Sequence, residues 1–189
     1  MKPETRRTGD ELLDAIATAV LKELQDEGYH GVTFEGVARR AETSKPVLYR
    51  RWAARPEMVF FAITRMAQPQ LSQPLQPTLR ENLRTIGKIL RAGFDEYRVE
   101  TTLGLMAEAT PELRAKFASY ELSPALCHIR SSLELAHEQG EIPEPVELFR
   151  LHRMAIQVFV GEFIAQGSCS DETIDAIVDD TLLPIYGAK

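Results

Sequence analysis

Residues 33–52 read TFEGVARRAETSKPVLYRRW, and the fold can be inferred outward from this stretch. Thr33 is one of the residue types that cap helix N-termini. The apolar residues after it recur at the i, i+3, i+4, i+7 spacing of one helix face, at Phe34, Val37, Ala38 and Ala41. We therefore predict a short helix that begins after Thr33 and ends at a break over residues 42–44.

A second short helix is predicted directly after this break. Ser44 is its expected N-cap, and Pro46 is tolerated in the first turn because the N–H groups there have no helical partner. Leu48 and Trp52 lie on the face that we expect to be buried. Two short helices joined by a tight turn are typical of a helix-turn-helix, whose second helix enters the major groove of DNA.

The outer face of this second helix carries residue types that contact DNA. Cations and hydroxyl groups bind phosphates, arginine reads guanine edges, and small apolar groups contact thymine methyls. A solvated charged face is the alternative interpretation of the same arginines. The candidate DNA-contacting residues in this stretch are Thr43, Ser44, Lys45, Pro46, Val47, Tyr49, Arg50 and Arg51.

Positive charge is concentrated around this helix. The chain has 189 residues and a net charge of −6, but residues 39–55 hold six Lys and Arg against Glu42 alone. The local field, rather than the overall charge, decides which face meets a polyanion. The sequence therefore predicts a basic surface on an otherwise acidic molecule.

The rest of the chain predicts helices and no strands. Residues 68–77 (QPQLSQPLQP) contain three prolines and no charge, which predicts a loop. We predict an all-α fold with a three-helix head in residues 1–55 and a helical domain in residues 56–189. A connecting helix is expected at about 56–67, and further helices at about 78–98, 101–109, 111–138, 145–166 and 171–183.

At this point the sequence resembles the TetR family of bacterial transcriptional regulators. Its residues 33–59, TFEGVARRAETSKPVLYRRWAARPEMV, are similar to the family pattern "T…IA..AGVS…LY.HF.SK..L". The resemblance implies that Thr33 contacts a phosphate and that residues 43–51 face the major groove or flanking phosphates. It also places Arg55 where the family has a phosphate-binding lysine. Pro46 departs from the pattern, because it replaces the usual glycine and stiffens the first turn.

The resemblance further implies a small-molecule pocket between the helices of the C-terminal domain. Such pockets are mostly apolar with a few polar groups that orient the ligand. Tyr97, Glu108 and Tyr120 are our candidates for orienting groups. Ordinary core packing is the alternative for the aromatic and apolar candidates, and a satisfied or surface polar residue is the alternative for Glu108. The candidate ligand-binding residues are Phe94, Tyr97, Leu103, Met106, Glu108, Phe117, Tyr120 and Phe159.

A homodimer is predicted through about residues 145–183. Residues 154–165 (MAIQVFVGEFIA) are apolar on nearly all sides, so this helix needs cover on more than one face. The last helix adds an apolar stripe, and Gly161 permits close approach of a second helix. A fully intramolecular core is the alternative. The stripe on the last helix consists of Ile174, Ile177, Val178 and Leu182.

Catalytic and metal-binding motifs are missing from the sequence. There is no GxGxxG, GxxxxGK[ST], GxSxG or HExxH, and the four histidines lack metal-ligand spacing. We therefore predict no enzyme activity, no cofactor and no metal. No apolar run is long enough to span a membrane, and two cysteines without a CxxC pair are typical of a reduced, cytoplasmic compartment.

Together these features predict a one-component transcriptional regulator. We expect a repressor that binds a pseudo-palindromic operator as a homodimer and is released by a small-molecule effector. The alternative function is a ligand-binding helical module whose head contacts a protein rather than DNA. The two differ in salt dependence, because binding to DNA weakens steeply as salt is raised.

Overall fold

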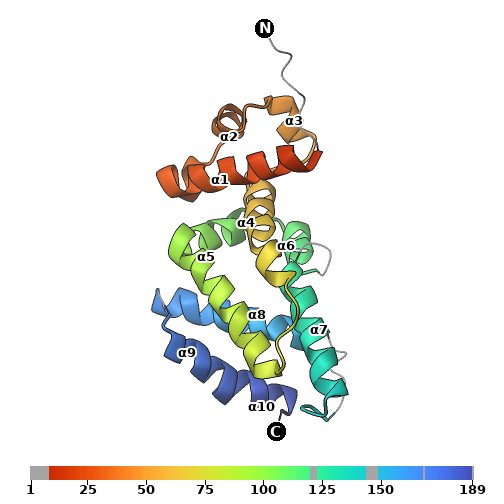
Figure 1. Ribbon diagram of the computed structural model, residues 1–189. Coiled ribbons are helices and arrows are strands. Elements are labelled where there is room, and N and C mark those ends of the chain that lie inside the picture. Colours follow the sequence, from red (N-terminus) through yellow and green to blue (C-terminus); the bar gives the residue numbers. More distant parts are fainter. Residues whose placement is uncertain (1–8, 120–122, 144–148, 168, 189) are drawn as a thin grey trace.

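The computed structural model describes residues 9–119, 123–143, 149–167 and 169–188, and all regular elements within these ranges are helical. Figure 1 shows a small head, formed by the first three helices, above a larger helical body, with α4 running from one to the other. The predicted all-α fold is therefore confirmed.

The head consists of α1 (Gly9–Gly31), α2 (Phe34–Arg40) and α3 (Lys45–Tyr49). The predicted helix-turn-helix is present: Thr33 caps α2 by accepting a hydrogen bond from the backbone N–H of Gly36 at 3.0 Å. Ser44 occupies the N-cap position of α3 with extended backbone but makes no side-chain capping bond. Leu48 and Trp52 are buried, at 0% and 7% exposure, as predicted.

The connecting helix α4 (Arg55–Leu71) is longer than predicted. It continues through Pro69 into the stretch expected to be a loop, because Leu71 is buried in the core of the body and its packing stabilises the last turn. The N-terminal half of α4 belongs to the core of the head, through Met58, Val59 and Ala62. The helix therefore takes part in both hydrophobic cores.

Helix α5 (Leu79–Glu108) contains a break at Arg98, where the backbone has φ 62° and ψ 158°. The two segments on either side agree with the helices predicted at 78–98 and 101–109. This backbone conformation strongly favours glycine, and holding another residue in it costs about 1–3 kcal/mol. The break changes the direction in which the second segment, residues 99–108, presents its side chains.

The single helix predicted over residues 111–138 is wrong. The chain forms α6 (Pro111–Phe117) and α7 (Pro124–Glu138) instead. Ser123 caps α7 by accepting a hydrogen bond from the N–H of Leu126, and Pro124 fits the first turn. A proline within one continuous helix would remove a backbone hydrogen bond and clash with the preceding turn.

The last helices are α8 (Phe149–Gln166), α9 (Asp171–Ala176), the π-helical turn η1 (Ile177–Leu182) and α10 (Leu183–Tyr186). Residues 145–148 of the predicted helix lie outside the described residues. The apolar stripe of the last helix faces the chain's own core, so the intramolecular alternative is correct for this helix. Its members Ile174, Ile177, Val178 and Leu182 are 0–7% exposed.

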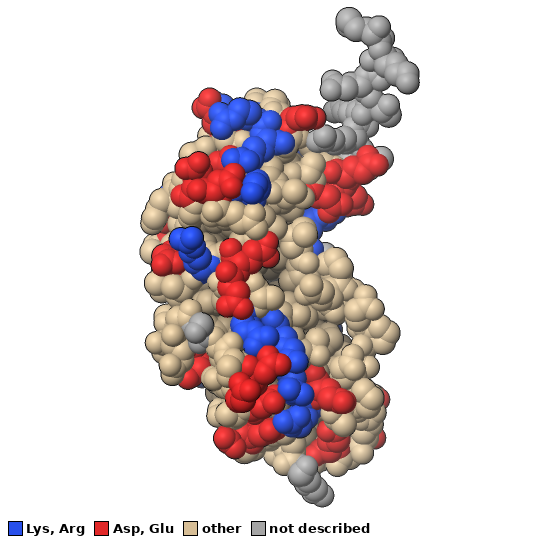
Figure 2. All heavy atoms as spheres, turned by 60° about the vertical axis from the view of Figure 1, so that its left-hand side comes forward, with Lys and Arg blue, Asp and Glu red and all other residues tan. Residues whose placement is uncertain are grey.

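A ladder of ion pairs holds the last helix against α5. Arg80 binds Asp179 through two hydrogen bonds of 2.7 Å, and Arg84 pairs with Asp175 one turn further along. Figure 2 shows this band of Lys and Arg flanked by Asp and Glu over the lower half of the molecule. The ladder ends where Lys88 and Arg91 both bind Asp171, at 3.2 and 2.5 Å.

Candidate nucleic-acid interface

Helix α3 presents a polar outer surface because Leu48 and Trp52 anchor its inner side. Trp52 packs against Phe61 of α4, with ring centroids 4.9 Å apart. The opposite side of the helix is open to solvent, as we predicted from the positions of Leu48 and Trp52. Ser44, Lys45, Pro46, Tyr49, Arg50 and Arg51 are exposed there, and Thr43 and Val47 are half-buried.

Aromatic stacking fixes α3 against α2. The ring of Tyr49 lies parallel to that of Phe34, with centroids 4.4 Å apart and an interplanar angle of 13°. Tyr49 is nevertheless 58% exposed, so its outer face and hydroxyl remain open. This stack was not predicted from the sequence; it joins the first residue of α2 to the last residue of α3.

Several cations of the head are paired with carboxylates. Arg40 donates to Glu23 at 2.5 Å and to Asp26 at 2.8 Å, and it thereby neutralises the buried Glu23. Lys45 donates to Glu35 at 2.7 Å, and this hydrogen bond lowers the pKa of the Glu35 carboxyl. The basic surface predicted from composition is therefore partly neutralised by acidic neighbours.

Three other arginines differ from these. Arg39, Arg50 and Arg51 form no salt bridge with a carboxylate in the described part of the chain. Arg51 instead donates to the backbone carbonyl of Val47 at 3.3 Å, within its own helix. Arg50 and Arg51 follow directly after the end of α3, and Arg39 lies in the last turn of α2.

Arg55 lies at the junction between head and body. Its guanidinium donates to both carboxylate oxygens of Glu108, at 2.5 and 3.1 Å, and to the backbone carbonyl of His30 at 2.6 Å. It also lies over the ring of Tyr29, 5.1 Å from the centroid. The predicted phosphate-binding residue is thus bound to a carboxylate of the body.

The neighbours of Glu108 keep this carboxylate ionised. Burial raises the pKa of Glu108, but hydrogen bonds from Arg55 and from the hydroxyl of Tyr29 outweigh burial and lower the pKa overall. Burial and the nearby Glu108 charge raise the pKa of Tyr29, so its hydroxyl remains a donor. The junction is therefore a charged, hydrogen-bonded cluster at neutral pH.

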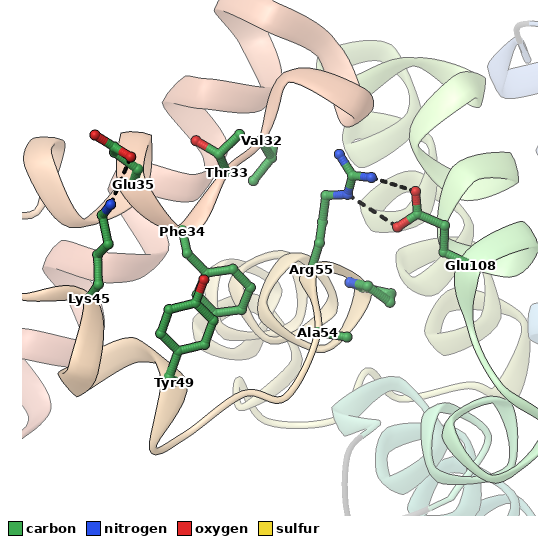
Figure 3. Close-up of a pocket in the computed structure, with 10 residues that line it drawn as sticks. Val32, Thr33, Phe34, Glu35, Lys45, Tyr49, Ala54, Arg55 and Glu108 are labelled. Carbon is green, nitrogen blue, oxygen red and sulfur yellow. Dashed lines mark hydrogen bonds and ion pairs between the residues drawn. The ribbon is translucent and has the colours of Figure 1, made fainter.

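A hollow of about 640 Å³ lies between the helix-turn-helix and this junction. Figure 3 shows Lys45 and Tyr49 on one side of it and the Arg55–Glu108 pair on the other. Thr33 lines the same hollow, and its hydroxyl hydrogen is not used in capping α2. The donors that line the hollow therefore come from α3, from the start of α4 and from the N-cap of α2, and its carboxylates are Glu35 on the head side and Glu108 on the body side.

Comparison with known proteins supports a DNA-binding role for this surface. Residues 16–60, which include the whole helix-turn-helix, match the family model "Bacterial regulatory proteins, tetR family". A curated relative from Mycobacterium tuberculosis is described as an uncharacterised HTH-type transcriptional regulator. It is 25% identical over 174 residues, which cover 89% of this chain and 85% of the relative.

The chain is similar to TetR-family transcriptional regulators, and its residues 16–60 match the model of that family.

Solved structures of TetR-family regulators share its fold. FadR from Bacillus subtilis, solved with stearoyl-CoA, has a TM-score of 0.56 and 15% identity over 95% of this chain and 98% of FadR. AibR, solved with isovaleryl coenzyme A and operator DNA, has a TM-score of 0.50 and 19% identity over 94% and 100%. At these identities the likeness concerns the fold.

The body of this protein brings only some of the predicted ligand-binding residues together. Phe159 is fully buried and Phe94 is half-buried, and both rings pack against Phe163, with centroids 6.1 and 5.3 Å away. Gly87 faces the Phe159 ring so closely that a Cβ there would overlap it. These residues form a close-packed part of the body's core.

The expectation that Leu103 and Met106 line the same interior is wrong. They are 49% and 40% exposed, because the segment after the Arg98 break buries Thr101, Gly104 and Leu105 instead. Glu108 also lies outside the core of the body, at the junction with the head. The predicted residues that the structure describes therefore do not all line one pocket.

The remaining candidates lie in separate places. Tyr97 is half-buried against the core of the head, and this burial raises its pKa. Phe117 stacks on Phe60 of α4, with centroids 4.1 Å apart, in a small cluster beside α6. Tyr120 lies outside the described residues.

A buried histidine was not predicted as a site residue. The Nδ1 of His128 lies 3.1 Å from the backbone carbonyl of Leu71, so α7 and the end of α4 are in direct contact. Its Nε2 is buried without a hydrogen-bond partner in the described part of the chain. An unpaired histidine nitrogen gives no signal in the sequence, because it depends on which helices meet.

The contact between Tyr29 and Gly104 was also not predicted from the sequence. The Tyr29 ring lies directly on α5 at Gly104, where a Cβ would overlap the ring.

Among the described residues, no three His, Cys, Asp or Glu side chains form a group that could hold a metal ion. None of the helices described here is long and apolar enough to cross a membrane.

Proposed function

We propose that this regulator is a repressor that binds a pseudo-palindromic operator as a homodimer and leaves it when a small molecule binds the body. The outer surface of α3 supports this proposal most directly. Arg50 and Arg51 face solvent there without a carboxylate partner among the described residues, next to exposed hydroxyl groups. This combination suits phosphate contacts and reading of base edges in the major groove.

The exposed side of α8 supports the homodimer. Ile164 is 37% exposed and Gly161 is exposed, so an apolar side chain and a site of close approach face outward from the same helix. A second copy of α8 would cover both. Two heads on a dimer would enter successive major grooves, ~34–36 Å apart, and each would raise the effective concentration of the other.

Acyl-CoA thioesters are the first effector class to test. FadR and AibR, which share this fold, were solved with stearoyl-CoA and isovaleryl coenzyme A. An effector releases the operator only if it binds the released conformation more tightly than the bound one. An acyl-CoA that weakens operator binding should therefore bind less tightly when DNA is present.

Selection from a random-sequence duplex pool, followed by binding measurements over a range of salt concentrations, tests the DNA-binding proposal. We expect a two-fold symmetric consensus and a steep linear fall of log K with log salt. Sequence-independent binding with a shallow salt dependence would instead favour a head that contacts a protein. Addition of acyl-CoAs of different chain length to the selected duplex then tests release.

Sedimentation of an Ile164→Glu variant tests the dimer. A charge at this position would be buried without a partner in the α8 interface, so we expect a folded monomer and a large loss of operator affinity. Leu103→Glu is the matched control, because Leu103 is 49% exposed on α5 and should leave the dimer intact. A wild-type protein that is monomeric while tightly bound to DNA would contradict the proposal.

A further inference from the structure

Arg55 and Glu108 bring the head and the body into direct electrostatic contact at the edge of the DNA-facing hollow. Three N–H groups of Arg55 are engaged, two by the Glu108 carboxylate and one by the carbonyl of His30. The two side chains are only 26% and 31% exposed. A guanidinium held in this way cannot also bind an operator phosphate in the two-pronged geometry that arginine favours.

We propose that Glu108 is an internal competitor of the operator phosphate for Arg55. This inference rests on the DNA-binding function proposed above. The Glu108 carboxylate presents two anionic oxygens to the guanidinium, as a phosphate does, and it belongs to the body rather than to the head. Docking of Glu108 and binding of phosphate at Arg55 therefore exclude each other.

The surrounding contacts hold Glu108 in place. The hydroxyl of Tyr29 donates to Glu108 at 3.1 Å, and the Tyr29 ring is seated on Gly104 one turn earlier in α5. Leu105 of the same turn is buried in the core of the head. The end of α5 is therefore docked on the head by apolar packing, and the carboxylate is aimed at Arg55 (Figure 3).

This arrangement couples the body to operator affinity. A conformation that keeps the end of α5 on the head places a negative charge beside the path of the DNA backbone and occupies Arg55. A conformation that withdraws Glu108 frees the guanidinium. Because the coupling is reciprocal, operator binding should in turn favour withdrawal of Glu108 from the head.

The Glu108→Gln variant tests the proposal, because it keeps the shape of the side chain and removes its charge. The probe is a duplex selected by the wild-type protein. We expect operator affinity to rise roughly tenfold, and the slope of log K against log salt to steepen by about one per head. Unchanged or weaker binding by a folded Glu108→Gln protein would overturn the proposal.

Three further variants make the test specific. Glu100→Gln removes the same charge from an exposed position on the same segment of α5 and should leave affinity unchanged. In an Arg55→Ala background, Glu108→Gln should have no effect; an equal gain there would show a general charge effect and overturn competition. Tyr29→Phe keeps the ring on Gly104 and loses the bond to Glu108, so it should give a smaller gain in affinity.

The two proposals fail in different ways. A wild-type protein that selects no duplex contradicts the DNA-binding function itself. A wild-type protein that binds its selected duplex, with a Glu108→Gln variant of equal affinity, contradicts only the competition for Arg55.

Discussion

Lys45 in the head and Arg80 in the body both donate to a carboxylate at 2.7 Å, yet the two ion pairs have different competitors. The partner of Lys45 is Glu35, on a surface that a polyanion would cover. The partner of Arg80 is Asp179, on a packed neighbour of the same chain. If the proposed DNA-binding function is correct, the pair in the head is exchanged for a phosphate contact, whereas the pair in the body joins two packed helices of the same chain.

The largest expected effect is a loss of stability when a buried apolar side chain that supports the head is removed. Trp52→Ala deletes a side chain that is 7% exposed, and we expect it to lower the free energy of unfolding by ~3–5 kcal/mol. Urea denaturation followed by circular dichroism measures this effect, with Trp52→Phe as the conservative control. A Trp52→Ala protein that is fully stable but no longer binds DNA would show that α3 is oriented differently.

The next largest effect is expected on the salt dependence of operator binding, when cations of the head are replaced by alanine. Lys45→Ala and Arg50→Ala should each reduce the salt slope of operator binding by about one per head, because each removes a phosphate contact. Arg84→Ala, in the body ladder, is the control and should leave the slope unchanged. Equal slopes in all three variants would contradict the division between head cations that contact phosphate and body cations that do not.

The ladder itself should contribute modestly to stability. Arg84 and Asp175 are 29% and 33% exposed, and a pair in such a position is worth about 1 kcal/mol or less. A double-mutant cycle with Arg84→Ala and Asp175→Ala, measured by urea denaturation, gives the coupling. A coupling several times larger would mean that the ladder, rather than the apolar core, holds the last helix on α5.

The smallest expected effect is a pH dependence of the ladder. Hydrogen bonds from Arg91 and Lys88 lower the pKa of Asp171, and Arg80 does the same for Asp179. Their folded pKa values lie below the unfolded ones, so this stabilisation is present above the unfolded pKa and is lost as the pH falls through the folded pKa.

Melting temperatures measured between about pH 5 and pH 3 should show this loss in the wild type and less of it in Asp171→Asn. Asp180→Asn is the control, since Asp180 is exposed on η1 and belongs to none of the rungs described above. A wild-type protein and an Asp171→Asn variant with the same pH dependence would exclude the ladder as its source.

The helix-turn-helix was predictable because its determinants are local. Thr33 caps the helix that follows it within one turn, and the spacing of Leu48 and Trp52 fixes which side of α3 is buried. No residue far away in the sequence is needed for either inference. The break between α6 and α7 was equally local, and Ser123 and Pro124 give the signal for it.

The junction was not predictable because its partners are distant in sequence. Arg55 and Glu108 are separated by 53 residues, and nothing near either residue specifies the other. Leu103 and Met106 were assigned to the interior by their apolar character alone. The Arg98 break turns their segment towards the head, and a backbone conformation so unfavourable for arginine has no local sequence signal.

The position of that break also has a mechanical consequence. Residues 99–108 form a helical arm ~15 Å long, at a rise of ~1.5 Å per residue. Rotation of this arm by ~10° at Arg98 would move its tip by roughly 2.6 Å, nearly the length of a hydrogen bond. A small change in the backbone angles of Arg98 would therefore be enough to separate Glu108 from Arg55 at the far end of the arm.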